Sequence, residues 1–255
     1  MAASSSARRR TAIVTGASQG IGAIIALALA RAGFDLVLTA RTTETLAATS
    51  REARDAGARV VGVALDLRDQ PAIERAMSAA VGAYGEIDVL VNNAGVTLRS
   101  TALEVTREQW DEVMAVMLTG TFFMSQQMGR HLVEQKRSGA ILNLASTHGL
   151  VGLAGRSTYG IAKGGIIQMT RMLAIEWSGY GIRVNALAPG TVGTPSRLEH
   201  YRVHPDDGQR LLVRIPLGRF ATAEEVGAAA VYLTSPAAAY VTGQTLVLDG
   251  GMTAA

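Results

Sequence analysis

Cysteine is absent from the 255-residue chain, which excludes disulfide bonds, thiolate zinc sites and cysteine nucleophiles. Long hydrophobic runs are absent as well: no stretch of about 18 uncharged apolar residues occurs, so we expect no segment that spans a membrane. The net charge is only +3, from 24 basic and 21 acidic residues, which disfavours nucleic-acid binding. The lack of cysteine fits a reducing compartment, and we expect a cytoplasmic protein.

Aromatic residues are scarce at 5%, whereas glycine is abundant with 28 residues. Hydrophobic residues make up 48% of the chain and charged residues 18%, a composition that excludes disorder of the whole chain. The glycines follow no collagen-like period. Glycine spread among small aliphatic residues instead favours tight turns and close packing in a layered α/β protein.

Short apolar runs alternate with helical patterns along the chain. The runs predict strands at Thr11–Thr15, Asp35–Ala40, Arg59–Ala64, Ile87–Val91, Ala140–Ala145, Ile182–Leu187 and Thr245–Leu248. The helical patterns cover Ile21–Ala32, Thr43–Ala56, Gln70–Ala83, Arg107–Gln135, Ser157–Ser178 and Ala223–Leu233. Nearly continuous apolar strands indicate burial on both faces, and hence a parallel sheet between helices. Right-handed crossovers then predict a doubly wound sheet of about seven strands, a Rossmann fold, with its ligand crevice beyond the carboxyl ends of the strands.

Two segments depart from this alternation. Residues 1–10 are polar, end in three arginines and lack the apolar core of a secretory signal. We expect them to form a disordered basic leader before a single domain over residues 11–255. Residues 195–220 are basic, contain prolines and are longer than ordinary connections, so we expect a substrate-binding loop there, with a surface insertion as the alternative.

A glycine-rich turn, Gly16–Gly22, joins the first predicted strand to an apolar helix. Glycine lets the backbone approach a pyrophosphate closely, and the free N–H groups at the start of a helix attract anionic oxygens. The turn therefore predicts a dinucleotide site, and a tight turn without any ligand is the alternative.

The end of the second predicted strand indicates which dinucleotide binds. An acidic residue there would bind the ribose hydroxyls and repel a 2′-phosphate. In this chain Arg41 follows the strand, and Asp35 lies at its far end. Arg41 can form charge-assisted hydrogen bonds to a 2′-phosphate, helped by the hydroxyl of Ser18 or Thr42. We therefore predict NADP(H) rather than NAD(H); the alternative is an Arg41 that contacts only solvent.

Tyr159 and Lys163 lie four residues apart on a predicted helix, so they share a face. A free phenol has a pKa of about 10, and a nearby ammonium group lowers it toward neutrality. Ser146 follows a predicted strand at the crevice edge, where its hydroxyl can donate to a substrate carbonyl. The alternative is an ordinary pair on a helix surface. A serine hydrolase is excluded because the Gly-x-Ser-x-Gly turn is missing.

Five motifs together resemble the short-chain dehydrogenase/reductase family, and the resemblance covers Thr11 to Gly251. They are Thr15-Gly16-x3-Gly20-x-Gly22, Asn92-Asn93-Ala94-Gly95, Tyr159-x3-Lys163, Pro189-Gly190 and Asp249-Gly250-Gly251. The part from Gly181 onward looks like the 3-oxoacyl-carrier-protein reductases and related sugar or alcohol dehydrogenases. The resemblance implies reversible interconversion of a carbonyl and an alcohol with a nicotinamide cofactor.

The resemblance also implies roles for individual residues. Ser146 would orient and polarise the carbonyl, Tyr159 would exchange the proton, and Lys163 would tune Tyr159 and hold the nicotinamide ribose. The substrate pocket would contain Ser146, Tyr159 and His148, although His148 can equally be a packed or solvated side chain. No metal is required. The implied cofactor-binding residues are Gly16, Ser18, Gln19, Gly20, Ile21, Arg41, Asp66, Leu67, Asn93, Ala94, Gly95, Tyr159, Lys163, Pro189, Gly190, Val192 and Thr194.

Met117 departs from the family pattern, because many members carry an asparagine at this point of the fifth helix. The asparagine completes a water-mediated relay to the lysine. A thioether is a weak acceptor and donates no hydrogen bond. A backbone carbonyl at this position would remain, so we expect a functioning but slowed enzyme.

The motifs together predict an NADP(H)-dependent oxidoreductase that reduces a ketone to a secondary alcohol. Two alternatives stay open: an NAD(P)-dependent alcohol or sugar dehydrogenase working oxidatively, and a catalytically weak NADP(H)-binding scaffold or sensor. The expected partner is a small ketone or alcohol. An acidic acyl carrier protein is a further possibility, which Arg130, Arg171 and the basic segment from Arg197 to Arg214 could contact; the alternative is that these arginines are solvated surface charges. The resemblance also implies a homotetramer.

Overall fold

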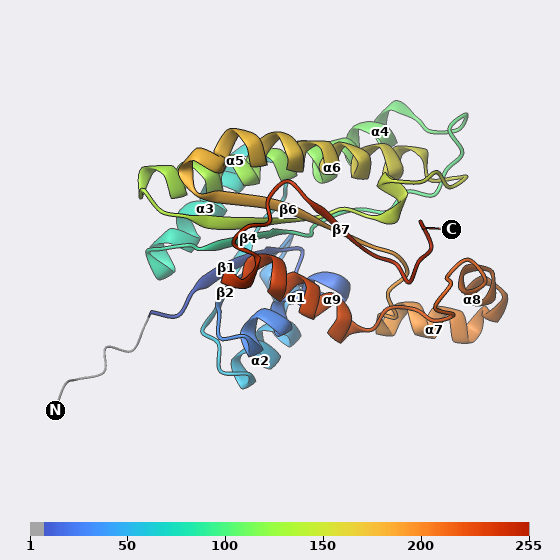
Figure 1. Cartoon of the computed structure of the whole chain (residues 1–255), viewed down its shortest axis with the longest axis horizontal. Helices are drawn as coiled ribbons and strands as arrows, with labels where there is room; N and C mark the ends of the chain where they lie inside the picture. Colours follow the sequence, from blue (N-terminus) through green and yellow to red (C-terminus); the bar gives the residue numbers. More distant parts are fainter. Residues whose placement is uncertain (1–7, 255) are drawn as a thin grey trace.

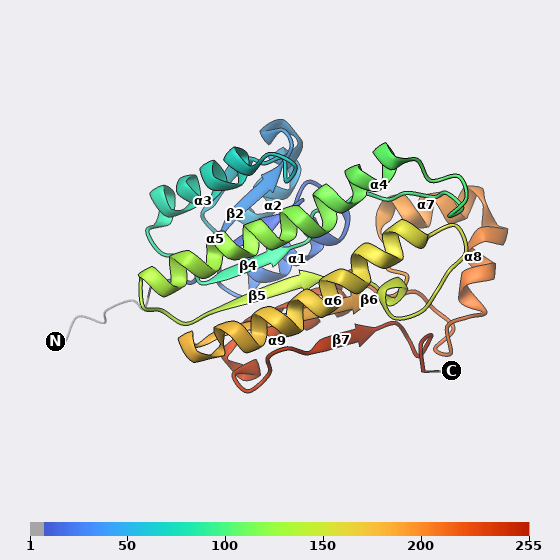
Figure 2. The same cartoon turned by 90° about the horizontal axis from the view of Figure 1, so that it is seen from above.

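The computed structural model describes residues 8–254. Seven parallel strands form one sheet in the order β3-β2-β1-β4-β5-β6-β7 (Figure 2). Their bounds are β1 (Thr11–Thr15), β2 (Asp35–Ala40), β3 (Val60–Ala64), β4 (Val89–Asn92), β5 (Gly139–Leu144), β6 (Ile182–Pro189) and β7 (Thr245–Leu248). The predicted doubly wound parallel sheet is confirmed.

The central strands are buried along their whole length, which explains their apolar composition. After β1 the chain builds β2 and β3 on one side, and it then returns to place β4 on the other side of β1. This reversal leaves a crevice between the loops that follow β1 and β4, at the carboxyl edge of the sheet.

Helices cover both faces of the sheet (Figure 1). One face carries α1 (Gly20–Arg31), α2 (Ala47–Asp55) and α9 (Ala223–Thr234); the other carries α3 (Gln70–Tyr84), α4 (Arg107–Met114), α5 (Gly120–Glu134) and α6 (Ser157–Trp177). A separate apolar core fills each side, with Ile25 and Leu29 of α1 in the first and Met124 and Leu132 of α5 in the second. No helix among residues 8–254 is both long and apolar enough to cross a bilayer.

The segment Arg107–Gln135, expected as one helix, is divided into α4 and α5 by a π-helical turn at Ala115–Thr119. Gly120 lies against the backbone of Leu67, and a Cβ atom on Gly120 would be 2.5 Å from the Leu67 carbonyl oxygen. This close approach of α5 to the loop after β3 accompanies the widened turn, and such turns are common at functional sites.

Residues 195–220, expected as a loop, instead form two short helices, α7 (Pro195–Val203) and α8 (Pro205–Leu212), followed by turns. Each helix carries its proline in the first turn, where the missing N–H costs nothing and the fixed φ favours the helix. Both helices lie beyond the carboxyl edge, and the arrowheads of β4, β5 and β7 point toward them in Figure 2.

The expected leader is described only in its last three residues, because residues 1–7 lie outside the described part of the chain. These three are not a free tail. Arg8 forms an ion pair with Asp88 at 2.6 Å, and Arg9 forms one with Asp35 at 3.4 Å. Buried carboxylates at the amino ends of the strands attract the arginines, since a buried charge needs a partner.

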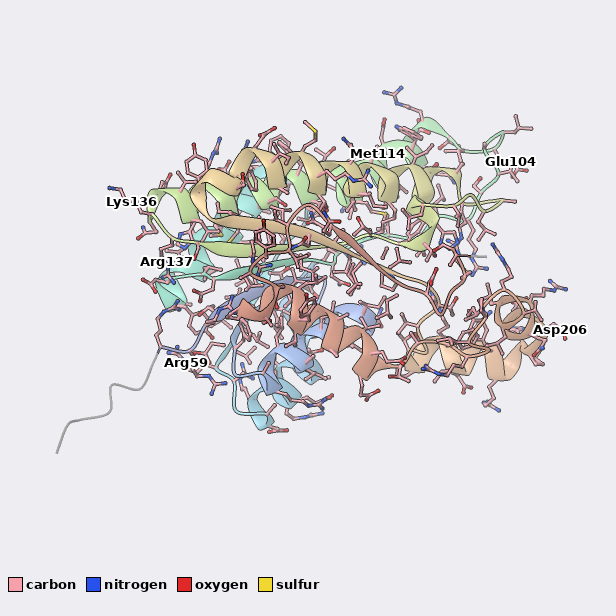
Figure 3. All side chains as sticks on the ribbon, in the orientation of Figure 1. Arg59, Glu104, Met114, Lys136, Arg137 and Asp206 are labelled. Atoms are coloured by element: carbon pink, nitrogen blue, oxygen red, sulfur yellow. The ribbon has the colours of Figure 1, made fainter. Side chains whose placement is uncertain are left out.

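Arg59 and Arg137 pair with the same two carboxylates, and both lie at the end of the molecule opposite to Glu104 and Asp206 (Figure 3). The amino edge of the sheet is thus closed by ion pairs. The carboxyl edge, near Glu104 and Asp206, is the end that opens into a cavity.

Candidate active site

A cavity of about 1090 Å³ lies at the carboxyl edge of the sheet. The loops after β1, β2, β3, β4, β5 and β6 all contribute to its walls, and α7 and α8 close one side. This is the crevice that the strand order predicts.

The glycine-rich turn forms one end of the cavity. Gly16 and Gly20 have positive φ values of 64° and 60°, which glycine adopts without strain. A Cβ atom on Gly22 would lie 2.2 Å from the Gly16 carbonyl oxygen. The turn is therefore as compact as the backbone allows, and it leaves the start of α1 facing the cavity with free N–H groups.

Hydrogen bonds fasten this turn to the loop after β4. The Asn93 side-chain amide donates to the carbonyl oxygens of Thr15 and Gly16 at 2.9 and 3.0 Å. The Thr15 hydroxyl accepts from the backbone N–H groups of Asn93 and Ala94, both at 3.0 Å. The two motifs that the sequence separates by about 75 residues thus build one rigid wall.

Arg41 and Arg68 both line the far end of the cavity, where the loops after β2 and β3 meet. The Arg68 guanidinium contacts Asp66 at 2.6 Å, and its hydrogen bonds hold the pKa of the Asp66 carboxyl below its usual range. Asp35, the acidic residue of β2, lies at the opposite end of that strand, where it is buried and paired with Arg59. This end of the cavity therefore presents guanidinium groups.

Ser146 and Tyr159 face the middle of the cavity. The Ser146 hydroxyl lies 3.2 Å from Nδ1 of His148 and accepts from the His148 backbone N–H at 3.2 Å. The His148 and Tyr159 rings meet edge to face, with centroids 6.0 Å apart. A Cβ on Gly160 would lie 2.8 Å from the His148 carbonyl oxygen, so the glycine lets this loop pack against α6.

Lys163 is buried one helical turn after Tyr159, and its Nζ donates a hydrogen bond to the carbonyl of Leu144. Burial lowers the pKa of Lys163 to about 8. Nζ lies 5.8 Å from the centroid of the Tyr159 ring. The ammonium group is thus held at a fixed place below the phenol.

The pKa of Tyr159 is raised, whereas the sequence predicted a lowered value. Burial raises the pKa of the phenol above its ordinary value, and the Ser146 hydroxyl, Arg156 and Arg197 act against that rise. Lys163 is not among the groups that lower it. The cations that lower the pKa of Tyr159 are therefore arginines, and neither belongs to the predicted motifs.

Of the residues predicted to bind cofactor or substrate, all but one line the cavity. The exception is Val192, whose side chain is fully buried and whose backbone pairs with Ala221. The lining residues are Gly16, Ser18, Gln19, Gly20, Ile21, Arg41, Asp66, Leu67, Asn93, Ala94, Gly95, Ser146, His148, Tyr159, Lys163, Pro189, Gly190 and Thr194.

Met117 lies in the π-helical turn and is 1% exposed. Its side chain packs with Val113 and Ala162, and Tyr159 lies against the same cluster. The place where the family pattern has an amide is therefore apolar in this protein.

Arg68 and Arg156 line the cavity but were not predicted, whereas Arg197 was expected only within a basic segment that could contact an acyl carrier. Of the two residues that were not predicted, Arg156 carried a usable signal, since it lies three residues before Tyr159 at the start of α6. Among residues 8–254, no group of three or more potential acidic or histidine metal ligands occurs.

Known proteins resemble this chain along nearly its whole length. The family model described as enoyl-(acyl carrier protein) reductase matches residues 16–253. The 3-oxoacyl-[acyl-carrier-protein] reductase FabG of Thermotoga maritima is 36% identical over 243 residues, covering 95% of this chain and 97% of that protein.

Two solved structures are similar along nearly their whole length. A candidate short-chain alcohol dehydrogenase from Sinorhizobium meliloti 1021 has 42% identity and a TM-score of 0.92, covering 96% of this chain and 97% of that one. A candidate 2-deoxy-D-gluconate 3-dehydrogenase from Agrobacterium tumefaciens, with bound NADP, has 38% identity, a TM-score of 0.88 and the same coverage. The chain therefore belongs to the short-chain dehydrogenase/reductase family, and it is an oxidoreductase of that family, as its motifs predicted.

Proposed function

We propose that this protein is an NADP(H)-dependent oxidoreductase that reduces a ketone to a secondary alcohol in a reversible reaction. The observation that carries the proposal is the convergence of Ser146, Tyr159 and Lys163 on one cavity that also contains the glycine-rich turn. A proton donor, a carbonyl-orienting hydroxyl and a dinucleotide cradle in one place are the parts that this reaction needs.

The cavity fits a dinucleotide. A side chain on Gly16 or Gly22 would collide with neighbouring backbone atoms. The two glycines therefore allow a tight turn, whose backbone a dinucleotide could approach closely. The start of α1 would hold the pyrophosphate, Asn93 to Gly95 the ribose, and Lys163 the nicotinamide ribose. When bound, NADPH supplies the hydride that the carbonyl carbon accepts.

The choice of NADP(H) over NAD(H) rests on Arg41. It is exposed to the cavity directly after β2, and no acidic residue occupies that strand end. A guanidinium forms paired hydrogen bonds with a phosphate, whereas an acid would repel it. The Ser18 hydroxyl lines the same end of the cavity and supports the same interaction.

Each catalytic residue has one task. The Ser146 hydroxyl donates to the carbonyl oxygen and stabilises the negative charge that develops there. Tyr159 transfers its phenolic proton to that oxygen, so that an alcohol leaves and solvent reprotonates the phenolate. Lys163 lies one helical turn after Tyr159, where its ammonium group would hold the nicotinamide ribose. The phenolate is stabilised by the Ser146 hydroxyl and by the charges of Arg156 and Arg197.

Oxidation of an alcohol or sugar is the second candidate, because the reaction is reversible and the similar solved structures are dehydrogenases by description. The two directions differ in the state of Tyr159. Reduction needs the protonated phenol, and burial favours that state by raising the pKa of Tyr159. The free enzyme therefore holds Tyr159 in the protonated form that the reductive step needs.

Assembly as a homotetramer is supported by apolar side chains on the outside of α6. Ile161, Met172 and Ile175 are 51%, 52% and 78% exposed. Exposed apolar surface of this kind commonly marks an interface between subunits. We propose that the enzyme works in the cytoplasm as such an oligomer, and light scattering of the purified protein tests the oligomeric state.

The activity is tested by adding a panel of ketones to enzyme and NADPH and following the loss of NADPH absorbance. We expect turnover with at least one ketone and a slower reaction with NADH. Tight NADPH binding without turnover on any carbonyl would instead support the scaffold or sensor alternative.

A further inference from the structure

Three guanidinium groups from separate elements line the same part of the cavity as Ser146 and Tyr159. Arg156 precedes α6, Arg197 lies in the first turn of α7, and Arg214 follows α8. The Arg156 guanidinium carbon lies 5.9 Å from the centroid of the Tyr159 ring. Cations therefore surround the place where the substrate carbonyl would be held.

These three arginines form no ion pair with any residue between 8 and 254. Neighbouring arginines do: Arg202, in the same helix as Arg197, contacts Glu199 at 2.7 Å, and Arg219 contacts Glu225 at 2.7 Å. Arg210, which also lines the cavity, lies 4.0 Å from Asp207. Arg197 and Arg214 are thus the cavity-lining arginines of this segment that have no ion-pair partner among the described residues.

The acidic residues of the cavity are engaged elsewhere. Asp66 is bound by Arg68, Asp207 lies 3.3 Å from the His200 ring, and Glu104 accepts a hydrogen bond from Thr101 at 2.8 Å. Glu112 is a wall residue near Arg68, whose pKa it helps to raise. None of these carboxylates offsets the positive charge around Tyr159.

The positive charge of these arginines lowers the pKa of nearby cationic groups. Burial lowers the pKa of His148, and Arg156, Arg214 and Arg197 lower it further, so the imidazole is held neutral. Burial and the charges of Arg99 and Arg197 also lower the pKa of Arg156 itself. Mutual repulsion of this kind raises the free energy of the empty site, and a bound anion would relieve it.

We propose that the substrate carries an anionic group, a carboxylate, sulfonate or phosphate, which Arg156, Arg197 and Arg214 bind while the carbonyl lies between Ser146 and Tyr159. The inference rests on the proposed ketone reduction at this site. Arginine suits all three anions because its planar fork donates two parallel hydrogen bonds. Arg156 also donates a hydrogen bond to the Leu98 carbonyl at 3.2 Å, which leaves its charge without a counterion. A neutral polyol could accept hydrogen bonds from the three guanidinium groups, but it would not neutralise their charge.

The position of Arg156 guides the choice of test substrates. Its guanidinium carbon lies over the Tyr159 ring, 5.9 Å from the centroid, so an anion bound there would be near the proposed proton donor. Ketones with a short spacer of two methylene groups, spanning roughly 3 to 4 Å, are therefore suitable probes.

A matched series of ketones tests the proposal: 4-oxopentanoate, 3-oxobutane-1-sulfonate, 3-oxobutylphosphonate and the neutral methyl 4-oxopentanoate. All four compounds carry the same methyl ketone and the same spacer of two methylene groups. We expect kcat/KM for the preferred anion to exceed that of the ester at least tenfold, as hydrogen bonds to charged groups typically give about that factor or more. The best of the three anions identifies the headgroup.

Two variants give the test its controls. In the double variant Arg197→Gln/Arg214→Gln, the ratio of kcat/KM for the anion to that for the ester should fall about tenfold or more. Arg202→Gln removes a guanidinium from the same helix outside the cavity, and it should leave the ratio at the wild-type value.

Calorimetric titration of the enzyme–NADP⁺ complex with the same four ketones gives a readout without turnover. If no ketone is reduced but the anions bind and the ester does not, the proposed reaction fails while the anion site stands. Equal binding and equal kcat/KM for anion and ester would overturn the inference. So would a double variant that weakens NADPH binding and leaves the ratio unchanged, because the arginines would then serve the cofactor. Reduction of an acyl-carrier-bound ketone alone, with no free anion bound, would also overturn it.

Discussion

The ammonium group of Lys163 donates a hydrogen bond to the carbonyl of Leu144, the last residue of β5. This bond ties α6, which carries Tyr159, to the strand that leads into Ser146. The three proposed catalytic groups are therefore positioned by one contact between a helix and a strand end. Because the contact buries the lysine, it also shifts the lysine's pKa into the range of working pH.

The first prediction concerns pH. The pKa of Lys163 is lowered to about 8, so its positive charge is complete below that pH and is lost as the pH rises through it. Burial raises the pKa of Tyr159, so the phenol stays protonated over the same range. We expect kcat/KM for NADPH, which reports groups of the free enzyme, to fall as the pH rises above about 8.

The variant Lys163→Arg serves as the control for this profile, since a guanidinium does not titrate in this range. Whatever activity it retains should not decline between pH 7 and 9.5. A flat wild-type profile over the same interval would contradict the assignment.

The second prediction concerns cofactor choice. Arg41→Asp removes the proposed partner of the 2′-phosphate and introduces an acid that can bind ribose hydroxyls. The ratio of kcat/KM for NADPH to that for NADH should fall by a factor of about 10–100. Arg51→Asp, an exposed site in α2 outside the cavity, is the matched control and should leave the ratio unchanged. An unaltered preference in Arg41→Asp would remove Arg41 from the cofactor site.

The third prediction concerns Met117. The residue is almost fully buried among apolar side chains, so Met117→Asn would bury an amide without partners at a cost of about 1–3 kcal/mol. We expect a lower Tm and a lower kcat. Met117→Leu, which nearly conserves volume, should change stability by less than about 1.5 kcal/mol.

A higher kcat in Met117→Asn would show the opposite. It would mean that the family's amide relay still operates here and that the native methionine impairs it, as our motif analysis expected. Thermal unfolding and single-turnover reduction, measured side by side, separate the two effects.

Apolar patterning alone predicted β1, β2 and β7 with their observed bounds and the other strands with ends that differ by at most two residues. Buried parallel strands leave such a continuous apolar signal. Ile87–Val91, for example, was expected where β4 spans Val89–Asn92. The π-helical turn at Ala115–Thr119 left no such signal, since it accompanies a backbone contact with the distant Leu67. Residues 195–220 were expected as a loop because they are basic, contain prolines and interrupt the alternation of strands and helices. Two of those prolines instead start helices.

The residues of the candidate site also fall into those that the sequence predicted and those that only the folded structure reveals. The glycines, Ser146, Tyr159 and Lys163 lie in short motifs, and a single sequence is enough to recognise them. The guanidinium groups of Arg156, Arg197 and Arg214 come from separate segments, and only the folded chain brings them to one cavity. Long-range packing decides which of many arginines faces the substrate, so no local pattern distinguishes them.

The most direct test of the proposed chemistry is single-turnover reduction by Tyr159→Phe, with NADPH binding measured in the same preparation. The phenyl ring keeps the packing against His148 and Met117 and removes only the proton donor. We predict a dissociation constant for NADPH close to that of the wild type and a reduction rate lower by about 10²–10⁴-fold. A variant that reduces its ketone at the wild-type rate would contradict the account.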